Sequence, residues 1–247
     1  MIKVDVMDET TEPLIVVIAN PIAGNPTQFA IERALNAMDL DWRVISFNVR
    51  PEDVAAALEG FLVTGIIGVF IDPSLEDEAS AWYAEKSDQE DQQVDCLFRE
   101  DTDDANGFQS SNERLAWIAS QSQGTTESER LWFGQEPLPD VIGLVESSVE
   151  PPEPCQVEAA KLVVITQVHD GNANLETADW PTDDGSTLVL DLTDGHPEQS
   201  SLRELGYRVL TKSDLYIGKL QRCLARWTHQ SAPVDVIHDA IEEYFGV

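Results

Sequence analysis

Positively charged side chains are scarce in this chain of 247 residues. It holds 15 lysines and arginines against 46 aspartates and glutamates, so its formal net charge is −31 and its pI is near 4.1. The resulting field repels nucleic-acid phosphates and anionic membrane surfaces, and we expect neither as a partner. Two interpretations of the acidity stay open. It is a solvated surface with no specific partner, or an adaptation to a salty environment, where screening within about 10 Å makes the self-repulsion tolerable.

Cysteine and histidine are too few and too scattered to indicate a metal centre. Cys96, Cys155 and Cys223 form no Cys-x-x-Cys pair, so we expect neither a zinc ribbon nor a redox motif and interpret them as free thiols. The 4 histidines also lack ligand spacing. We therefore predict no metal.

Long apolar runs are missing as well. No stretch approaches the roughly 18 apolar residues that a transmembrane helix needs. Residues 1–13 carry acidic groups where a signal peptide needs an apolar segment, so we expect a cytoplasmic location. A hydrophobic content of 42%, with 6 tryptophans and 8 phenylalanines, still predicts a folded chain with one large or two modest domains.

The first third of the chain alternates between strand and helix patterns. Strands are expected at 14–19, 42–47 and 66–71, and helices at 28–38 and 52–62. Such alternation favours parallel strands joined by right-handed crossovers. In the turn after the first strand, Asn25 is expected to cap the helix, with Pro26 at its first position and Gln28 as a capping-box partner.

The same alternation continues to the end of the chain. Further strands are expected at 94–99, 131–133, 141–145, 161–165, 187–190 and 207–210, and further helices at 112–120, 215–227 and 234–245. We predict an α/β protein of two domains. Residues 1–106 and 215–247 form a substrate-binding-type α/β domain, onto which the C-terminal helices pack back. Residues 107–214 form a shortened Rossmann-like domain with a parallel sheet.

Short motifs along the chain resemble the shikimate dehydrogenase family. Val17-Ile-Ala-Asn-Pro-Ile-Ala23 is similar to the family's opening V-I-G-x-P-I, and Val94-Asp-Cys-Leu-Phe-Arg-Glu100 to its V-N-T-L-V-R-E. Leu188-Val-Leu-Asp-Leu192, Leu205-Gly-Tyr-Arg-Val209 and a helix closing on Trp227 follow in the family's order. No single match is specific, but their succession is typical of the family. The resemblance implies a two-domain fold and NADP-dependent oxidation of shikimate or quinate.

The residues at the family's functional positions depart from its pattern. The two serines that bind substrate in the family fall on Asn25 and Thr27, which either contact a ligand or cap the helix. The family's proton-transfer lysine falls on Leu75 or Glu76, and its catalytic aspartate falls on Ser111. None of these three supplies the proton acceptor that hydride transfer needs, so we predict no catalytic residue.

Three further positions belong to the same region. A glutamine of the family's closing helix falls on Lys219, and a tyrosine falls near Asp194. Asp72 substitutes as a proton acceptor, faces solvent or caps the next helix. The predicted substrate-binding residues are Asn25, Thr27, Asp72, Ser111 and Lys219.

The expected cofactor loop is degenerate. Dinucleotide binding needs G-x-G-x-x-G between a strand and a helix, so that the backbone can approach the pyrophosphate. Segment 131–139 offers only Gly134, followed by Glu136 and by Pro137 and Pro139, which lack backbone donors. At about 4 Å in water, Glu136 would repel each phosphate charge by about 1 kcal/mol. We expect no cofactor, or NADP if the chain is an active dehydrogenase.

The sequence therefore predicts a shikimate dehydrogenase-like protein that has lost oxidoreductase activity. It binds a small acid, or a protein partner, in the cleft between its domains. Two alternatives stay open. One is an active NADP-dependent shikimate or quinate dehydrogenase of aromatic amino-acid biosynthesis. The other is a non-catalytic assembly module, for which the helix at 215–227 would supply a homodimer surface.

Overall fold

The computed structural model describes residues 12–87, 93–99, 107–134, 150, 152–166, 177, 179–193 and 199–246. It forms two compact units: Met1–Glu113 with Ile217–Val247, and Arg114–Tyr216. The strand expected at 141–145, most of the expected cofactor loop, and Asp194 lie outside the described residues. In the part of the chain that is described, no helix is both long and apolar enough to cross a membrane.

The first unit is built on a mixed sheet. Its strands are β1 (Leu14–Ala19), β2 (Arg43–Asn48), β3 (Gly68–Ile71), β4 (Cys96–Phe98) and β5 (Gln109–Ser111), in the order β2-β1-β3-β4-β5. Strand β1 pairs in parallel with β2 and β3, as predicted, whereas β3–β4 and β4–β5 are antiparallel. Strand β5 was not predicted, because its Gln-Ser-Ser sequence has no apolar alternation.

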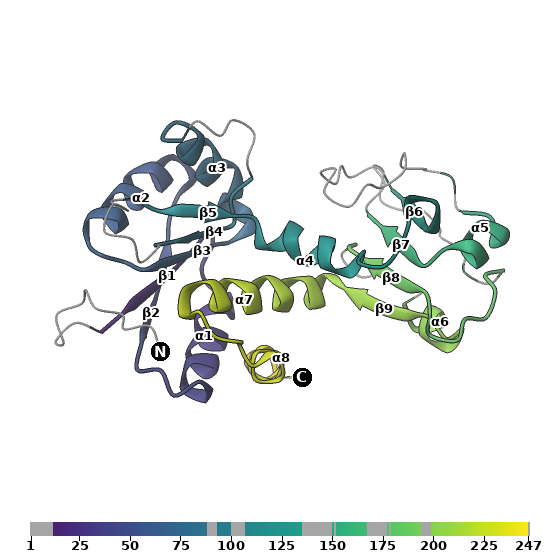
Figure 1. Cartoon of the computed structure of the whole chain (residues 1–247). Coiled ribbons are helices and arrows are strands. Elements are labelled where there is room, and N and C mark those ends of the chain that lie inside the picture. Colours follow the sequence, from purple (N-terminus) through teal and green to yellow (C-terminus); the bar gives the residue numbers. More distant parts are fainter. Residues whose placement is uncertain are drawn as a thin grey trace. The chain divides into compact units, whose positions relative to one another are not determined.

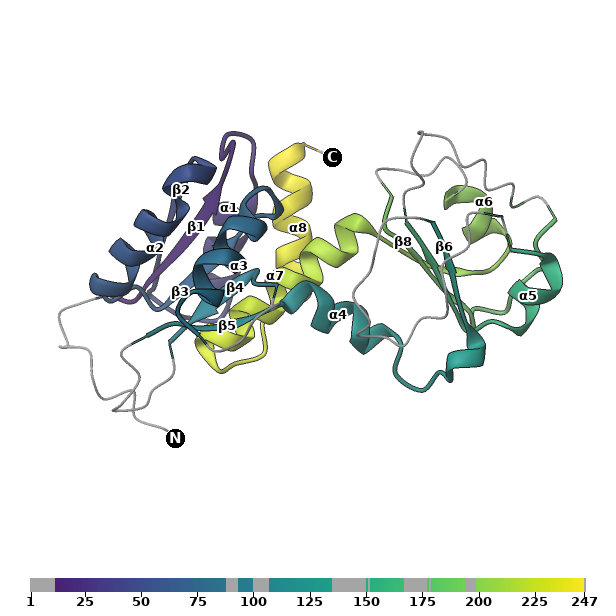
Figure 2. The ribbon, with the colours of Figure 1, turned by 90° about the horizontal axis from the view of Figure 1, so that it is seen from above.

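Helices cover both faces of this sheet. They are α1 (Thr27–Ala37), α2 (Val54–Val63), α3 (Glu76–Ala84), the part of α7 (Lys212–Thr228) from residue 217 on, and α8 (Val234–Phe245), with 3-10 turns η1 (Pro51–Asp53) and η2 (Pro73–Leu75). Figures 1 and 2 show α2 and α3 on one face and α1 and α8 on the other. A buried cluster joins Val16, Ile18 and Val69 of the sheet to Leu58 and Trp82 of the helices. The fully buried apolar runs at β1 and β3 are what made these two strands predictable.

A glycine sets the distance between α7 and the sheet. A Cβ on Gly68 would lie 2.4 Å from Nε1 of the Trp227 indole, closer than packed atoms approach. The indole N–H donates to the Leu97 carbonyl at 2.9 Å. Trp227 therefore packs directly on the backbone of β3 and β4 and holds the end of α7 on the sheet.

The start of α1 differs from the prediction. The helix begins at Thr27 with Pro26 as its N-cap residue, one position later than expected, and Oδ1 of Asn25 accepts the Thr27 N–H at 2.9 Å. The predicted capping-box role of Gln28 is wrong. Its amide nitrogen donates to Glu32 one turn along the helix, and its oxygen accepts from Ser46 on β2. Those two partners satisfy the Gln28 amide in place of the backbone N–H of the turn.

The second unit contains a parallel sheet of four strands in the order β6-β7-β8-β9. They are β6 (Arg130–Phe133), β7 (Leu162–Ile165), β8 (Leu188–Asp191) and β9 (Arg208–Thr211), and the helices are α4 (Glu113–Gln121), α5 (Pro154–Ala159) and α6 (Gln199–Glu204), with a 3-10 turn η3 (Glu127–Glu129). One buried cluster joins the sheet to Val157 of α5 and Leu202 of α6, and another joins it to Ile118 of α4. Figure 2 shows α4 on the opposite face of this sheet from α5 and α6. The α/β fold class is confirmed.

Candidate ligand site

Two of the predicted site residues meet where β1 and β3 end. The register of the two parallel strands places Ile18 beside Ile71, so the turns that follow them are neighbours. The amide nitrogen of Asn25 donates to Oδ2 of Asp72 at 2.9 Å, while Oδ1 of Asn25 accepts both the N–H and the hydroxyl of Thr27. The contacts of Asn25 and Thr27 match the capping alternative. A ligand contact at either residue stays a prediction.

Asp72 organises the turn after β3. Its Oδ1 accepts the N–H of Ser74 at 3.0 Å and the Ser74 hydroxyl at 2.8 Å, which makes Asp72 the N-cap of η2. The Ser74 hydroxyl oxygen in turn accepts the Asn20 N–H at 3.0 Å. A continuous set of hydrogen bonds therefore joins the carboxyl ends of β1 and β3. Parallel sheets commonly bind ligands at this edge.

Lys219 reaches the same edge from α7. Its Nζ donates to the carbonyl oxygen of Ile71 at 2.6 Å and to Oε1 of Glu76 at 3.0 Å, and it lies 3.8 Å from Oδ2 of Asp95. The ammonium also sits 4.4 Å from the ring centroid of Phe70. The side chain is 2% exposed. Burial lowers the pKa of Lys219, but the charges of Asp95 and Glu76 outweigh that effect and hold the pKa above its usual value.

The structure accounts for both positions at which the resemblance puts the family's lysine. Leu75 is fully buried in the core under α2 and α3. Glu76 begins α3 and gives its carboxylate to Lys219. The ammonium of this region therefore comes from α7 and is paired with a carboxylate. The sequence gives no sign of this pair, because its members lie 143 residues apart.

Ser111 ends β5, the strand next to β4 at the edge of the sheet. It pairs with Cys96, and its carbonyl accepts the N–H of Asp95 at 3.1 Å. Oδ1 of Asp95 accepts the N–H of Glu113 at 2.7 Å, so Asp95 links Lys219 to the start of α4. Sequence reasoning passed over Asp95, although it stands where the family motif V-N-T has its asparagine.

Gly134 has a local structural reason to be glycine. It follows β6 with a φ of 135°, and a Cβ there would lie 2.2 Å from the hydroxyl of Thr166, which follows β7. The ends of two paired strands are thus too close for a side chain. No cofactor role is needed to explain this glycine.

One group among the described residues has metal-ligand geometry. The ligand atoms of His238, Asp239 and Glu242 on α8 all lie within 4.8 Å of one another. All three side chains are exposed, and such groups are common on acidic surfaces without a metal. The i, i+4 spacing of His238 and Glu242 was the signal available in the sequence.

We call the polar side chains that follow β1 and β3, together with Lys219 and its two carboxylate partners, the strand-end cluster: Asn25, Asp72, Ser74, Glu76, Asp95 and Lys219. Its charged members are three carboxylates and one ammonium, a formal sum of −2. Carboxylate and amide oxygens accept hydrogen bonds from hydroxyl groups. The same carboxylates repel an anion.

No family model matches the chain. A stretch of 52 residues is 40% identical to the shikimate dehydrogenase (NADP(+)) of Geobacter metallireducens, and it covers 21% of this chain and 18% of that relative. The structure is similar to that of shikimate 5-dehydrogenase from Thermus thermophilus in complex with shikimate, with a TM-score of 0.67 and 13% identity over 95% of this chain and 100% of that one. It is also similar to ligand-free 5-ketofructose reductase of Gluconobacter sp. strain CHM43, with a TM-score of 0.71 and 13% identity over 95% of this chain and 99% of that one. The chain has the two-domain fold of the shikimate dehydrogenases, as the sequence predicted.

Proposed function

We propose that this chain uses the shikimate dehydrogenase fold to bind a small hydroxylated molecule at the strand-end cluster and has lost hydride transfer. The observation that carries the proposal is the state of Lys219. A lysine that accepts a proton from a reacting hydroxyl must first be neutral. Lys219 donates to Ile71 and Glu76, and its pKa is raised, so its side chain stays protonated and hydrogen-bonded.

The net negative charge of the strand-end cluster favours a neutral ligand over an anionic one. Asp72, Glu76 and Asp95 outnumber the single ammonium of Lys219, so an acid would meet repulsion there. A neutral polyol would instead donate a hydroxyl proton to the carboxylate of Asp72, since Glu76 and Asp95 are buried. One protein with this fold is named 5-ketofructose reductase, and the sugar in that name carries no charge. We therefore propose a neutral ligand in place of the small acid that the sequence alone predicts.

A second candidate is an active NADP-dependent dehydrogenase. The 52-residue stretch at 40% identity to an NADP(+)-dependent shikimate dehydrogenase favours it. The sequence of the expected cofactor loop, with its single glycine, glutamate and two prolines, supports the first proposal over this one. A cytoplasmic location and a homodimer stay predictions of the sequence.

Matched ligands test the proposal. Shikimate and its methyl ester share their hydroxyl groups and differ in charge, and calorimetric titration of the full chain measures both affinities. We expect the ester to bind at least fivefold more tightly than the acid. Asp72→Asn keeps a hydrogen-bonding side chain and removes one negative charge, so it should narrow that ratio. Asp53→Asn is the control, since Asp53 pairs with Arg50 at the start of α2.

Each outcome decides the matter. The proposal is supported if the ratio of the ester affinity to the acid affinity is unchanged in Asp53→Asn and smaller in Asp72→Asn. Tighter binding of the acid contradicts the choice of a neutral ligand. Shikimate-dependent reduction of NADP contradicts the loss of hydride transfer.

A further inference from the structure

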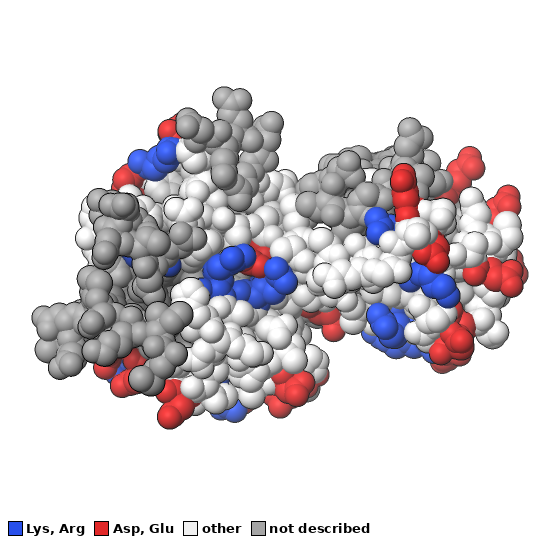
Figure 3. Space-filling model, viewed as in Figure 1, with Lys and Arg blue, Asp and Glu red and all other residues white. Residues whose placement is uncertain are grey.

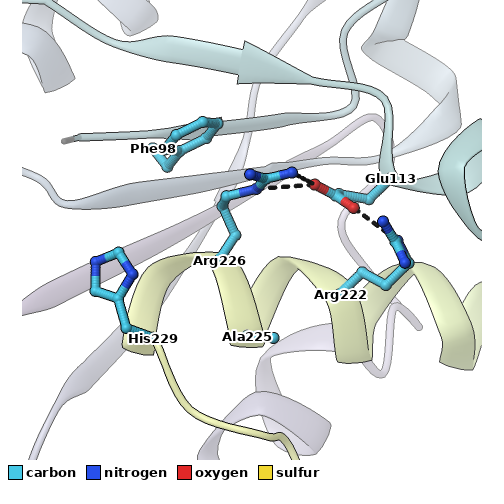
Figure 4. A pocket seen from close by; sticks show the side chains of 6 residues that line it. All are labelled: Phe98, Glu113, Arg222, Ala225, Arg226 and His229. Carbon is cyan, nitrogen blue, oxygen red and sulfur yellow. Dashed lines mark hydrogen bonds and ion pairs between the residues drawn. The ribbon is translucent and has the colours of Figure 1, made fainter.

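A pocket on the first unit is lined by none of the residues that the sequence predicted for the site. It has a volume of about 360 Å³ and is lined by Phe98, Glu113, Arg222, Ala225, Arg226 and His229. Figure 4 shows Arg222, Ala225, Arg226 and His229 along α7 and the residue after it, with Phe98 and Glu113 opposite. We call it the arginine pocket.

Two arginines share one buried carboxylate in this pocket. Nε of Arg222 donates to Oε2 of Glu113 at 2.8 Å, while Nε and Nη2 of Arg226 donate to Oε1 at 3.1 and 2.8 Å. The Glu113 side chain is 1% exposed, and the arginines are 37% and 43% exposed. Burial raises the pKa of Glu113, but the hydrogen bonds from Arg226 and the charges of both arginines outweigh that effect, so the pKa lies below its usual value.

Among the residues that the structure describes, these ion pairs leave one of the two arginine charges without a carboxylate partner. Arg222 and Arg226 stand four residues apart on one helix face, where like charges are destabilising. Glu113 neutralises only one of them, in a protein with three times as many acids as bases. Figure 3 shows basic side chains gathered around a single acidic spot over α7.

Hydrogen-bond donors remain at the pocket. A guanidinium carries five N–H groups. Arg222 gives only its Nε to Glu113, and Arg226 its Nε and Nη2. Both Nη groups of Arg222 and Nη1 of Arg226 make no other hydrogen bond to the described parts of the chain. Planar carboxylates match this fork geometry.

An aromatic wall and an unusual backbone complete the pocket. The Arg226 guanidinium lies 5.0 Å from the centroid of the Phe98 ring, which fixes its orientation and offers an apolar surface beside the charge. His229 follows α7 with a φ of 54°, the left-handed conformation in which glycine is most favourable. A histidine is less favourable than glycine in this conformation, and its imidazole lines the pocket.

We propose that the arginine pocket binds a small organic monocarboxylate with a flat apolar body. Its carboxylate pairs with the remaining N–H groups of Arg222 and Arg226 and balances the one surplus charge, and its body packs against Phe98 and Ala225. Binding here does not depend on the function proposed for the strand-end cluster, to which the pocket is joined by the hydrogen bond from the Glu113 N–H to Asp95.

Benzoate is the test probe, because it combines one carboxylate with one flat ring. Calorimetric titration of the full chain is run at a constant ionic strength of about 0.15 M, where the Debye length of about 8 Å screens the general repulsion of anions. Acetate, inorganic phosphate and neutral benzamide are titrated in parallel. We expect benzoate to bind at least tenfold more tightly than each of the three.

Three variants locate the binding. Arg222→Gln should weaken benzoate binding at least tenfold. His229→Gly should weaken it about threefold without lowering the melting temperature, because glycine suits the left-handed conformation. Arg50→Gln removes the same charge from an exposed arginine that pairs with Asp53, and it should leave the affinity unchanged.

The possible results separate clearly. The pocket is supported if benzoate binds more weakly to Arg222→Gln and His229→Gly, and as tightly to Arg50→Gln as to the wild type. Equal loss in Arg50→Gln overturns it, because the effect would then be general electrostatics. Benzamide, acetate or phosphate binding as tightly as benzoate overturns the ligand class, and no heat with benzoate up to about 100-fold molar excess overturns the site.

Discussion

Replacement of Lys219 by methionine should destabilise the first unit strongly. Methionine approximates the length of the lysine stem and suits a helix, so the change removes mainly the charge and its hydrogen bonds. It leaves Glu76, which is 8% exposed, and Asp95, which is 0% exposed, without their cation, and the Ile71 carbonyl without its donor. Removing one partner of a buried ion pair costs about 3–5 kcal/mol, and we expect a loss of unfolding free energy in that range.

A surface pair provides the matched control. Lys86 pairs with Glu59 and lies 5.5 Å from the Trp82 ring centroid, the same chemistry that Lys219 shows with Glu76 and Phe70. Because Lys86 and Glu59 are 43% and 48% exposed, Lys86→Met should cost no more than about 1 kcal/mol. The difference between the two variants isolates the effect of burial.

Urea unfolding at pH 7, followed by tryptophan fluorescence, measures both variants. The pH dependence adds a second check. Since the folded pKa of Lys219 is raised, its contribution is complete below the unfolded value of about 10.4 and disappears as the pH rises through the folded pKa. Wild type and Lys219→Met should therefore converge only in strong alkali. A loss of unfolding free energy in Lys219→Met no larger than that in Lys86→Met would show that the buried ion pair adds no stability beyond that of an exposed one.

Three further predictions concern packing and ionisation. Gly68→Ala should lower the unfolding free energy by several kcal/mol and change the emission of Trp227, because the new Cβ would overlap the indole ring; unchanged stability and emission would contradict that packing. Glu113→Gln should make the unfolding free energy depend less on pH in the acid range. The folded pKa of Glu113 is lowered, so its carboxylate contributes stability above an unfolded pKa of about 4.3, and this stability is lost as the pH falls through the folded value. Parallel curves of unfolding free energy against pH for the two proteins would argue against this contribution. A thiol reagent should modify the exposed Cys155 at once and Cys223 only in denaturant, since Cys223 is buried and burial raises its pKa; equal rates in the native protein would disprove this burial.

Sequence patterns predicted the fold well where burial is continuous. Strands β1, β3 and β7 are runs of apolar residues, and the structure places them within two residues of their predicted bounds. Strand β5 and helix α6 were missed because both are short and polar, so that pairing and tertiary packing decide their conformation.

The candidate site was harder to predict than the fold. Asn25 was identified because the resemblance puts a substrate-binding serine of the family at its position, and Asp72 because it stands in the segment that carries the family's lysine. The partners of Lys219 were not, since Glu76 and Asp95 lie far from it in sequence and only the fold brings them together. The arginine pocket was missed for the same reason, although the i, i+4 spacing of its arginines on α7 was visible.

We propose that the chain keeps the shikimate dehydrogenase fold and has lost hydride transfer. The most direct test incubates the purified full chain at about 10 μM with NADP and saturating shikimate, and in parallel with quinate, and follows absorbance at the nicotinamide band over hours. We expect no reduction of NADP above the rate without protein. Reduction that depends on shikimate or quinate and scales with the protein concentration would contradict it.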